Sequence, residues 1–211
     1  MKYKLICFDM DGVIFEPVNF WLELHRKFST YEEGVKLTRK HLYSDYKKLV
    51  EEVVVKLWKG KYAKPYYRLI NSIKYMKGVK QVFEHVKSKG LFTAIITSGS
   101  VELARREQKD FGIDHIFANE LVIKKGKVSG EFIWPIGAGK HKKAEIIRDL
   151  CRDLSIKPKE CIYIGDSETD LEAFKEVGLS IAFNSESDKL KKAATHVVSS
   201  RNLADIIKYI Q

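Results

Sequence analysis

A short apolar run near the N-terminus leads directly into two closely spaced carboxylates. Residues 5–8 read Leu-Ile-Cys-Phe, and Asp9-Met10-Asp11-Gly12 follows them. Continuous apolar character over so few residues is typical of a central strand covered on both faces. Open α/β sheets bind ligands where such strands end. The two carboxylates repel each other and need compensation, most simply from a divalent cation. An ordinary strand with an Asp-Gly turn is the alternative interpretation.

Further along the chain, apolar runs alternate with helical patterns. We expect strands at 92–96, 116–118, 161–164, 180–183 and 196–198, a β-hairpin of 120–123 with 127–133, and helices at about 79–89, 100–111, 142–154 and 203–209, with one more helix after residue 170. Strands that alternate with helices predict a parallel sheet with right-handed crossovers. The predicted fold class is therefore α/β, with a parallel-sheet core and a β-hairpin.

The segment of residues 16–78 breaks this alternation. Apolar residues recur there at helical spacing, and the segment has no convincing strand pattern. We expect an all-helical insert of three or four helices after the first strand. The chain would then consist of an α/β core, residues 1–15 and 79–211, and a small helical cap, residues 16–78.

Much of the net charge of +10 lies in this predicted cap. Residues 16–78 contain 14 Lys and Arg against 7 Asp and Glu, and they hold 11 of the 24 aromatic residues. A basic segment rich in aromatic residues can attract nucleic acid or a small anionic substrate. Solvated lysine-rich helices give the same composition, so the charge alone leaves all three interpretations open.

The cysteines and the hydropathy pattern bear on the compartment. The three cysteines are widely separated and lie in apolar segments, which is typical of reduced core residues rather than of a disulfide or zinc site. No apolar run reaches membrane-spanning length, and charges interrupt the N-terminus where a signal peptide would be apolar. We therefore expect a cytoplasmic protein with no membrane partner.

Three of the predicted strands end in polar residues that suit phosphoryl transfer. In chain order these residues are Asp9, Asp11, Thr97, Ser98, Gly99, Asp166 and Asp170. The carboxyl ends of parallel strands meet at one edge of a sheet, so these groups can converge. Phosphoryl transfer needs a nucleophile, a proton donor for the leaving oxygen, Mg²⁺, and cationic or amide donors around the phosphoryl oxygens.

Together with Lys143, which precedes the predicted strand 161–164, this order of motifs resembles the haloacid dehalogenase superfamily. The resemblance is closest to the phosphoserine phosphatase branch, because Phe-Ala-Asn at 117–119 is followed by a hairpin with Gly126 and Gly130. It covers both parts of the predicted core, and the family also carries a helical cap after its first motif. The resemblance implies a three-layer Rossmann-like core and a Mg²⁺-dependent phosphomonoesterase that forms an aspartyl-phosphate.

The resemblance also implies how the chemistry is divided. Asp9 would attack phosphorus. Asp11 would protonate the leaving alkoxide and then take a proton from the hydrolysing water. Lys143 would neutralise Asp9 and a phosphoryl oxygen together. An acid at the position of Asp11 favours phosphatases or phosphomutases within the superfamily, so a phosphomutase or phosphotransferase with the same aspartyl-phosphate is the alternative.

The same resemblance implies the ligand sets. Mg²⁺ would be held by Asp9, the main-chain carbonyl of Asp11 and Asp166, with Asp170 supporting its waters. The residues that would bind the phosphoryl group are Thr97, Ser98, Gly99 and Lys143. Taken singly, Lys143 is also one of several lysines at a helix start, and Asp170 also suits a helix cap.

The cap departs from the phosphoserine phosphatase pattern. In that family, a Glu early in the cap and an Arg on a later cap helix hold the amino-acid end of the substrate, whereas Val18 and Val54 lie near those positions here. Glu16 and Arg68 are the charged residues that we expect to take their place. The loss of both charged partners would remove charge-assisted hydrogen bonds of about 1.5–3 kcal/mol each, which argues against phosphoserine.

The leading hypothesis is a phosphomonoesterase that acts on a small anionic phosphorylated metabolite enclosed by the basic cap, as a monomer or homodimer. A nucleic-acid-binding module built on the cap is the alternative from another class, and it predicts salt-sensitive binding without turnover. The full set of catalytic residue types favours the enzyme, with no nucleic-acid partner.

Overall fold

The computed structural model describes residues 2–211. Its sheet has seven strands in the order β4-β3-β2-β1-β5-β6-β7, and neighbouring strands are parallel except for the β3–β4 hairpin. The strands are β1 Leu5–Phe8, β2 Phe92–Ser100, β3 His115–Lys124, β4 Lys127–Ile133, β5 Cys161–Gly165, β6 Leu179–Phe183 and β7 His196–Val198. The predicted α/β fold class with a parallel core and a hairpin is confirmed.

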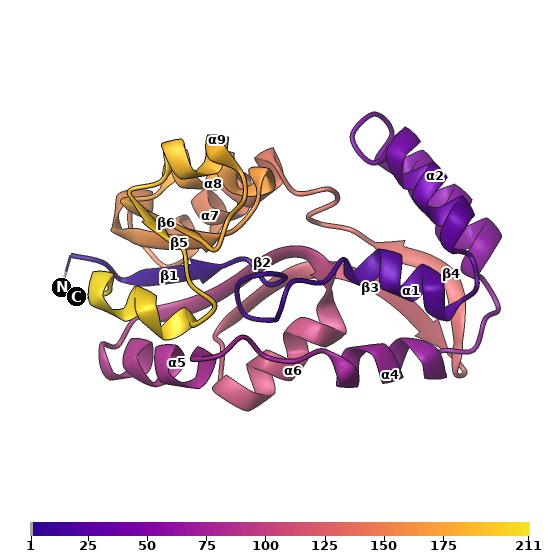
Figure 1. The fold of residues 1–211 in the computed structure, drawn as a ribbon, viewed down its shortest axis with the longest axis horizontal. Helices are drawn as coiled ribbons and strands as arrows, with labels where there is room; N and C mark the ends of the chain where they lie inside the picture. The colour runs from indigo at the N-terminus through magenta and orange to yellow at the C-terminus, as the bar shows by residue number, and fades with distance from the viewer. Residues whose placement is uncertain (1) are drawn as a thin grey trace.

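Helices cover both faces of the sheet, which gives the three layers seen in Figure 1. One face packs on α5 Val79–Ser88, α6 Val101–Phe111 and the 3₁₀-helix η4 Leu203–Tyr209. The other face packs on α7 His141–Asp153, α8 Leu171–Glu176 and α9 Asp188–Ala193. Alternate residues of β1 explain the arrangement: Ile6 and Phe8 belong to the first core, and Leu5 and Cys7 to the second.

The segment between β1 and α5 is helical, as the spacing of its apolar residues predicts. It contains α1 Phe20–Lys27, α2 Tyr31–His41, α3 Tyr46–Val50, the π-helical stretch η1 Glu51–Trp58 and α4 Lys64–Ser72. These helices lie at the end of the molecule opposite the two termini (Figure 1).

Backbone hydrogen bonds tie this helical segment to the β-hairpin. The N–H of Gly60 donates to the carbonyl of Val128, and the N–H of Ala63 donates to the carbonyl of Gly126. One hydrophobic cluster also runs from the α5 face of the sheet into the helices, where it includes Phe20 and Trp58. Hairpin and helices are therefore packed as one continuous structure.

Several boundaries differ from the sequence-based expectation. The predicted strands 116–118 and 120–123 form one strand, β3, because its first half pairs with β2 and its second half with β4. The last helix is 3₁₀ rather than α. Helix α9 was not predicted, although Ser187 caps it by accepting from the N–H of Leu190. Two short 3₁₀ turns, η2 Pro158–Glu160 and η3 Glu168–Asp170, flank β5.

Within residues 2–211, every helix is too short or too polar to cross a bilayer.

Candidate active site

The carboxyl ends of β2, β1 and β5 lie side by side, and Asp9 stands at their centre. Asp9 directly follows β1, and its N–H donates to the carbonyl of Ile164 on β5 at 2.9 Å. Its carboxylate is 7% exposed and accepts from the N–H of Met10 and from Nζ of Lys143, both at 2.7 Å. Burial raises the pKa of Asp9 to about 6, although Lys143 opposes the rise. A buried, fixed carboxylate therefore occupies the strand end.

Lys143 is fully buried in the first turn of α7 and joins two carboxylates. Its Nζ donates to Oδ2 of Asp9 and to Oδ1 of Asp170, each at 2.7 Å. Burial alone would lower the pKa of Lys143, but Asp170 and Asp9 together hold it above its ordinary value. The ammonium is therefore charged and its position is set by both partners.

Asp170 is held by four hydrogen bonds. Besides Lys143, the hydroxyl of Tyr163 donates to Oδ1 at 3.0 Å, and the backbone N–H groups of Asp166 and Ser167 donate to Oδ2 at 3.2 Å. The same carboxylate caps the 3₁₀ turn η3. Asp170 thus takes part in the capping box of η3 and fixes Lys143, whereas its side chain makes no cap hydrogen bond to α8, the next helix.

Carboxylate oxygens of Asp9, Asp166 and Asp170 lie within 4.8 Å of one another. Burial, followed by the charge of Asp9, raises the pKa of Asp166 to about 8. Three carboxylates share one buried ammonium, so the cluster carries excess negative charge when ionised. Carboxylate oxygens at this spacing suit a hard divalent cation such as Mg²⁺, which would relieve that repulsion.

Gly12 makes room for this cluster. Its φ of +82° lies in the left-handed region that favours glycine, and a side chain on its Cα would collide with Oδ2 of Asp166. The Asp-Gly turn and the functional strand end are thus the same feature.

The carboxyl group of Asp11 stands apart from the three-carboxylate cluster. Its Oδ1 is buried and has no hydrogen-bond partner among residues 2–211. Burial and the nearby charge of Asp9 raise the pKa of Asp11 to about 8. The group therefore carries a proton at neutral pH, which suits a proton donor.

The last residues of β2 are polar or small and lie at the same edge. Thr97 is buried, and its Oγ1 accepts from the N–H of Gly99 at 3.0 Å. The carbonyl of Ser98 accepts from Nε1 of Trp21 and from Nδ2 of Asn119, both at 2.9 Å. The end of β2 is therefore fixed from both the core and the helical segment.

Asn119 is a positioning residue that the sequence pattern did not single out for this role. It is fully buried, and its Nδ2 donates to the carbonyls of Ser98 and Gly137, while its Oδ1 accepts from the N–H of Gly137 at 3.1 Å. It joins the β2 end to the loop before α7. The sequence contained one signal for this role. Asn119 follows a short apolar run, and an amide that is buried there needs hydrogen-bond partners.

Glu107 on α6 was also missed. Its side chain is fully buried, and neither carboxyl oxygen has a hydrogen-bond partner among the described residues. Burial, with a further contribution from the charge of Asp11, raises the pKa of Glu107 well above its ordinary value. Its helical position gave no signal, because a lone Glu on a helix is usually exposed.

The two charged cap residues expected from sequence do not reach the site. Glu16 and Arg68 are both exposed, and neither lines the hollow beside Asp11 or the cavity among the helices. Val18 lines the first of these and Val54 the second. None of these four residues therefore places a charged group in the hollow or in the cavity, where it could hold a zwitterionic substrate.

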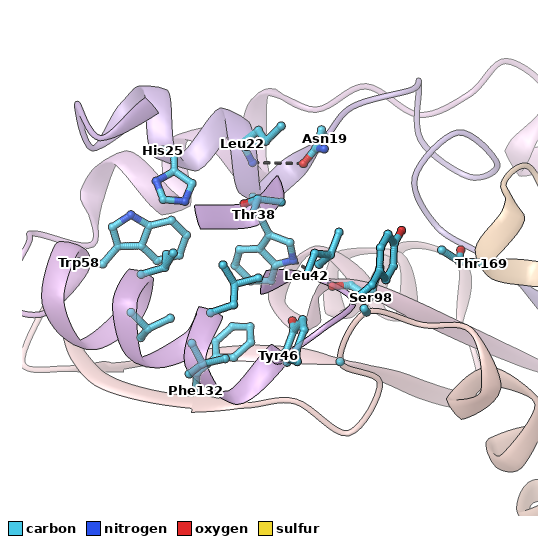
Figure 2. A pocket seen from close by; sticks show the side chains of 18 residues that line it. Asn19, Leu22, His25, Thr38, Leu42, Tyr46, Trp58, Ser98, Phe132 and Thr169 are labelled. Carbon is cyan, nitrogen blue, oxygen red and sulfur yellow. Dashed lines mark hydrogen bonds between the residues drawn. The ribbon is translucent and has the colours of Figure 1, made fainter. Parts of the chain in front are cut away.

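A cavity lies among α1, α2, α3, η1 and β4 and has a volume of about 180 Å³ (Figure 2). Trp58, Phe132 and Tyr46 belong to its wall, and Ser98 and Thr169 line it at the core. Asn19, which caps α1, lines both this cavity and the hollow that holds Asp11 and Asp166. The cavity thus connects the polar strand ends with the helical segment.

Comparison with known proteins decides the family. Residues 3–178 match the haloacid dehalogenase-like hydrolase family. This chain belongs to that family. It falls in the phosphoserine phosphatase-like branch of these haloacid dehalogenase-like hydrolases, and family and branch together indicate a phosphatase.

Relatives in this branch cover the whole chain. A phosphoserine phosphatase from Methanocaldococcus jannaschii is 27% identical over 215 residues, which span 100% of this chain and 99% of that protein. One from Archaeoglobus fulgidus is 29% identical over 99% of this chain, which spans only 60% of that longer relative. A solved substrate-bound phosphoserine phosphatase complex aligns over 100% of both chains with a TM-score of 0.85 and 26% identity.

Proposed function

We propose that this protein is a Mg²⁺-dependent phosphomonoesterase that hydrolyses a small phosphorylated metabolite through an aspartyl-phosphate on Asp9. The observation that carries the proposal is the buried arrangement of Asp9 with Lys143 at 2.7 Å and with Asp166 and Asp170 within 4.8 Å. Solved phosphoserine phosphatases with the same fold, among them one titled as a phospho-aspartyl intermediate analogue, support it further.

The proposed reaction has two steps. An Asp9 oxygen attacks phosphorus as the bond to the leaving alkoxide breaks, and the proton of Asp11 passes to that alkoxide. Water then attacks the aspartyl-phosphate, Asp11 takes a proton from it, and free Asp9 returns as phosphate leaves. The raised pKa of Asp11, about 8, supports the first role because the group is protonated at neutral pH.

Asp9, Asp166, Asp170 and the main-chain carbonyl of Asp11 are the groups that we propose for Mg²⁺. When bound there, the cation would offset the charge of the carboxylates and of the phosphoryl oxygens. Lys143 holds Asp9 in one orientation through its second bond to Asp170. The residues that we propose for the phosphoryl group are Thr97, Ser98, Gly99 and Lys143, because the end of β2 lies at the same edge as Asp9.

We also propose that residues 16–78 act as a cap over a catalytic core of residues 1–15 and 79–211. The all-helical character of the segment supports this division. So does its position, since Trp21 reaches Ser98 at the strand end from α1.

Phosphate release from acetyl phosphate, with Mg²⁺ or with excess EDTA, tests the proposal. We expect Mg²⁺-dependent release, and we expect Asp9→Asn to lower it by at least about 10⁴-fold because the nucleophile is gone. Asp149→Asn is the matched control, since that carboxylate is 59% exposed and pairs only with Arg152. Full activity in Asp9→Asn would refute the mechanism. Phosphate transfer to added alcohols in place of release would identify a phosphotransferase.

A further inference from the structure

The cavity among the helices lies beside residues at the polar strand ends. Ser98, which lines the cavity, neighbours Thr97, and Thr169, on the same wall, neighbours Asp170. Asn19 lines this cavity and also the hollow with Asp11 and Asp166. The cavity therefore adjoins the strand ends, which makes it the candidate place for the body of a phosphoester whose phosphoryl group lies at Asp9. The side chains that line the cavity indicate which kind of body it can hold.

The walls carry no formal charge. Of the described residues that line the cavity, none is Asp, Glu, Lys or Arg. His25 is the imidazole among them, and its Nδ1 lies 2.8 Å from Oγ1 of Thr30. Burial lowers the pKa of His25 to about 4, so its ring is neutral at physiological pH. Burial also raises the pKa of Tyr46, which keeps that phenol neutral.

Aromatic and aliphatic side chains make up most of the surface. The ring of Trp21 lies 6.3 Å from that of Trp58 and 5.3 Å from that of Phe132, centroid to centroid. Val53 and Val54 from η1 close the wall beside them. Figure 2 shows Trp58, Phe132 and Tyr46 around the space. An apolar cavity of about 150 Å³ accepts a benzene ring, so about 180 Å³ holds a group of that size.

A zwitterionic body fits these walls poorly. An ammonium and a carboxylate would both lose water without gaining a charged partner, which disfavours binding strongly. The nearby cation is Lys140, whose Nζ lies 3.7 Å from the ring centroid of Tyr43. Tyr43 is 62% exposed, so this ammonium stands at the solvent side of the cavity rather than within it.

We propose that the substrate of this site is the phosphomonoester of an uncharged alcohol whose apolar body is about the size of one aromatic ring. This inference rests on the proposed phosphatase function and adds the class of leaving group. Trp21, Val54 and Trp58 are the specificity-determining residues in this assignment.

Benzyl phosphate and phosphoserine form the test pair, because both are phosphate esters of primary alcohols and differ in the charge of the body. We expect kcat/KM for benzyl phosphate to exceed that for phosphoserine by about 100-fold or more. Equal or better turnover of phosphoserine overturns the inference. Acetyl phosphate has no body to fill the cavity, so its turnover reports the reacting groups alone. Absence of release from all three compounds refutes the phosphatase proposal itself.

Neighbouring valines on η1 provide a matched pair of variants. Val54 is 3% exposed and lines the cavity, whereas Val55 is 41% exposed and does not line it. We expect Val54→Lys to lower kcat/KM for benzyl phosphate by about 10-fold or more, chiefly through KM, with a smaller loss for acetyl phosphate. Val55→Lys should leave both unchanged.

Val54→Thr keeps nearly the same shape and carries the test if the lysine variant does not fold. We expect it to raise KM for benzyl phosphate by about 3-fold, since a hydroxyl is added to an apolar wall. Unchanged KM values for benzyl phosphate in the folded Val54 variants would overturn the assignment of this cavity.

Discussion

The hollow beside Asp11 and the cavity among the helices share Asn19 in their linings but differ in the charge of their other lining residues. Asp11 and Asp166 line the hollow at the strand ends, next to a buried Lys143, whereas no Asp, Glu, Lys or Arg is among the described residues of the cavity in the helices. Lys143 pairs with Asp9 at 2.7 Å, whereas Oδ1 of Asp11 has no hydrogen-bond partner among the described residues. In the cavity among the helices, mostly apolar side chains form the lining and define its shape. Chemistry common to all phosphoesters can therefore reside in the first, and selection of the leaving group in the second.

This contrast explains why family membership and substrate separate in this protein. In the proposed mechanism, the carboxylates and the lysine act on the phosphoryl group, which every phosphomonoester shares. Val54 lines the cavity that we propose for the part of the substrate that differs between esters. A chain of this kind can therefore keep the groups that act on the phosphoryl group and still differ in the alcohol part of the substrate that it accepts.

Among the variants that compare the two hollows, the largest expected effect comes from the buried lysine beside the charged hollow. Lys143→Met leaves Asp9 and Asp170 without their shared cation, so we expect acetyl phosphate turnover to fall by about 10²–10³-fold. We also expect a loss of about 3–5 kcal/mol in the free energy of unfolding. Activity assays and urea denaturation measure the two effects.

Lys142→Met is the control for that variant. Lys142 is 58% exposed and pairs with Glu145 on the surface, so its loss should change stability by about 0–1 kcal/mol and leave activity as it is. If the Lys143 variant lost no more activity than this control, the charged hollow would not be the reacting site.

A substitution in the uncharged cavity should affect the free energy of unfolding more strongly than the turnover of acetyl phosphate. Trp58 is 2% exposed, packs on the rings of His25 and Phe28, and donates from Nε1 to Oγ1 of Thr30 at 3.2 Å. We expect Trp58→Ala to cost about 3–5 kcal/mol in unfolding free energy. Acetyl phosphate turnover per folded molecule should fall far less than in Lys143→Met.

Trp134→Ala is the matched control, because that ring is 39% exposed. Its cost in unfolding free energy, measured in the same urea titrations, should be well below that of Trp58→Ala. A loss of acetyl phosphate turnover in Trp58→Ala as steep as in Lys143→Met would contradict the division between the two hollows.

The smallest expected effect concerns Glu107, a buried carboxyl group beside the charged hollow. Its raised pKa means that the folded protein holds a proton that the unfolded chain releases above about pH 4.5. Stability from this group is therefore fully present below the unfolded pKa and is lost as pH rises toward the folded pKa. Glu107→Leu should stabilise the protein by about 1–3 kcal/mol at pH 8 and by less at pH 5.

Urea unfolding of both proteins at pH 5 and pH 8 measures that difference. Asp9, Asp11 and Asp166 also have raised pKa values, but they are present in both proteins, so the comparison isolates position 107. Equal stabilisation at the two pH values would show that Glu107 does not hold its proton in the folded state.

Much of the core could be predicted from the sequence because its signals are local. The apolar run before Asp9, the run before Thr97 and the run before Asp166 each identify a buried strand and its end. Parallel pairing then requires these ends to share an edge, and the register of β1 with β2 and β5 places them there. Lys143 was found only through the family resemblance, because a lysine at a helix start carries no signal of burial.

Only the tertiary structure decided what surrounds that edge. Trp21 and Asn119 meet on the carbonyl of Ser98 from opposite directions, although they lie 77 and 21 residues away in the chain. Glu16 and Arg68 have the right charge in sequence but are exposed. The cavity has no charged lining because four helical elements and a strand turn apolar faces toward one another.

The sequence by itself therefore determined the fold class and the residue types at the strand ends, since these follow from short-range periodicity and from the geometry of parallel sheets. The tertiary structure decided which side chains surround the substrate's body, because a cavity is formed by residues distant in the chain whose orientation no local pattern records.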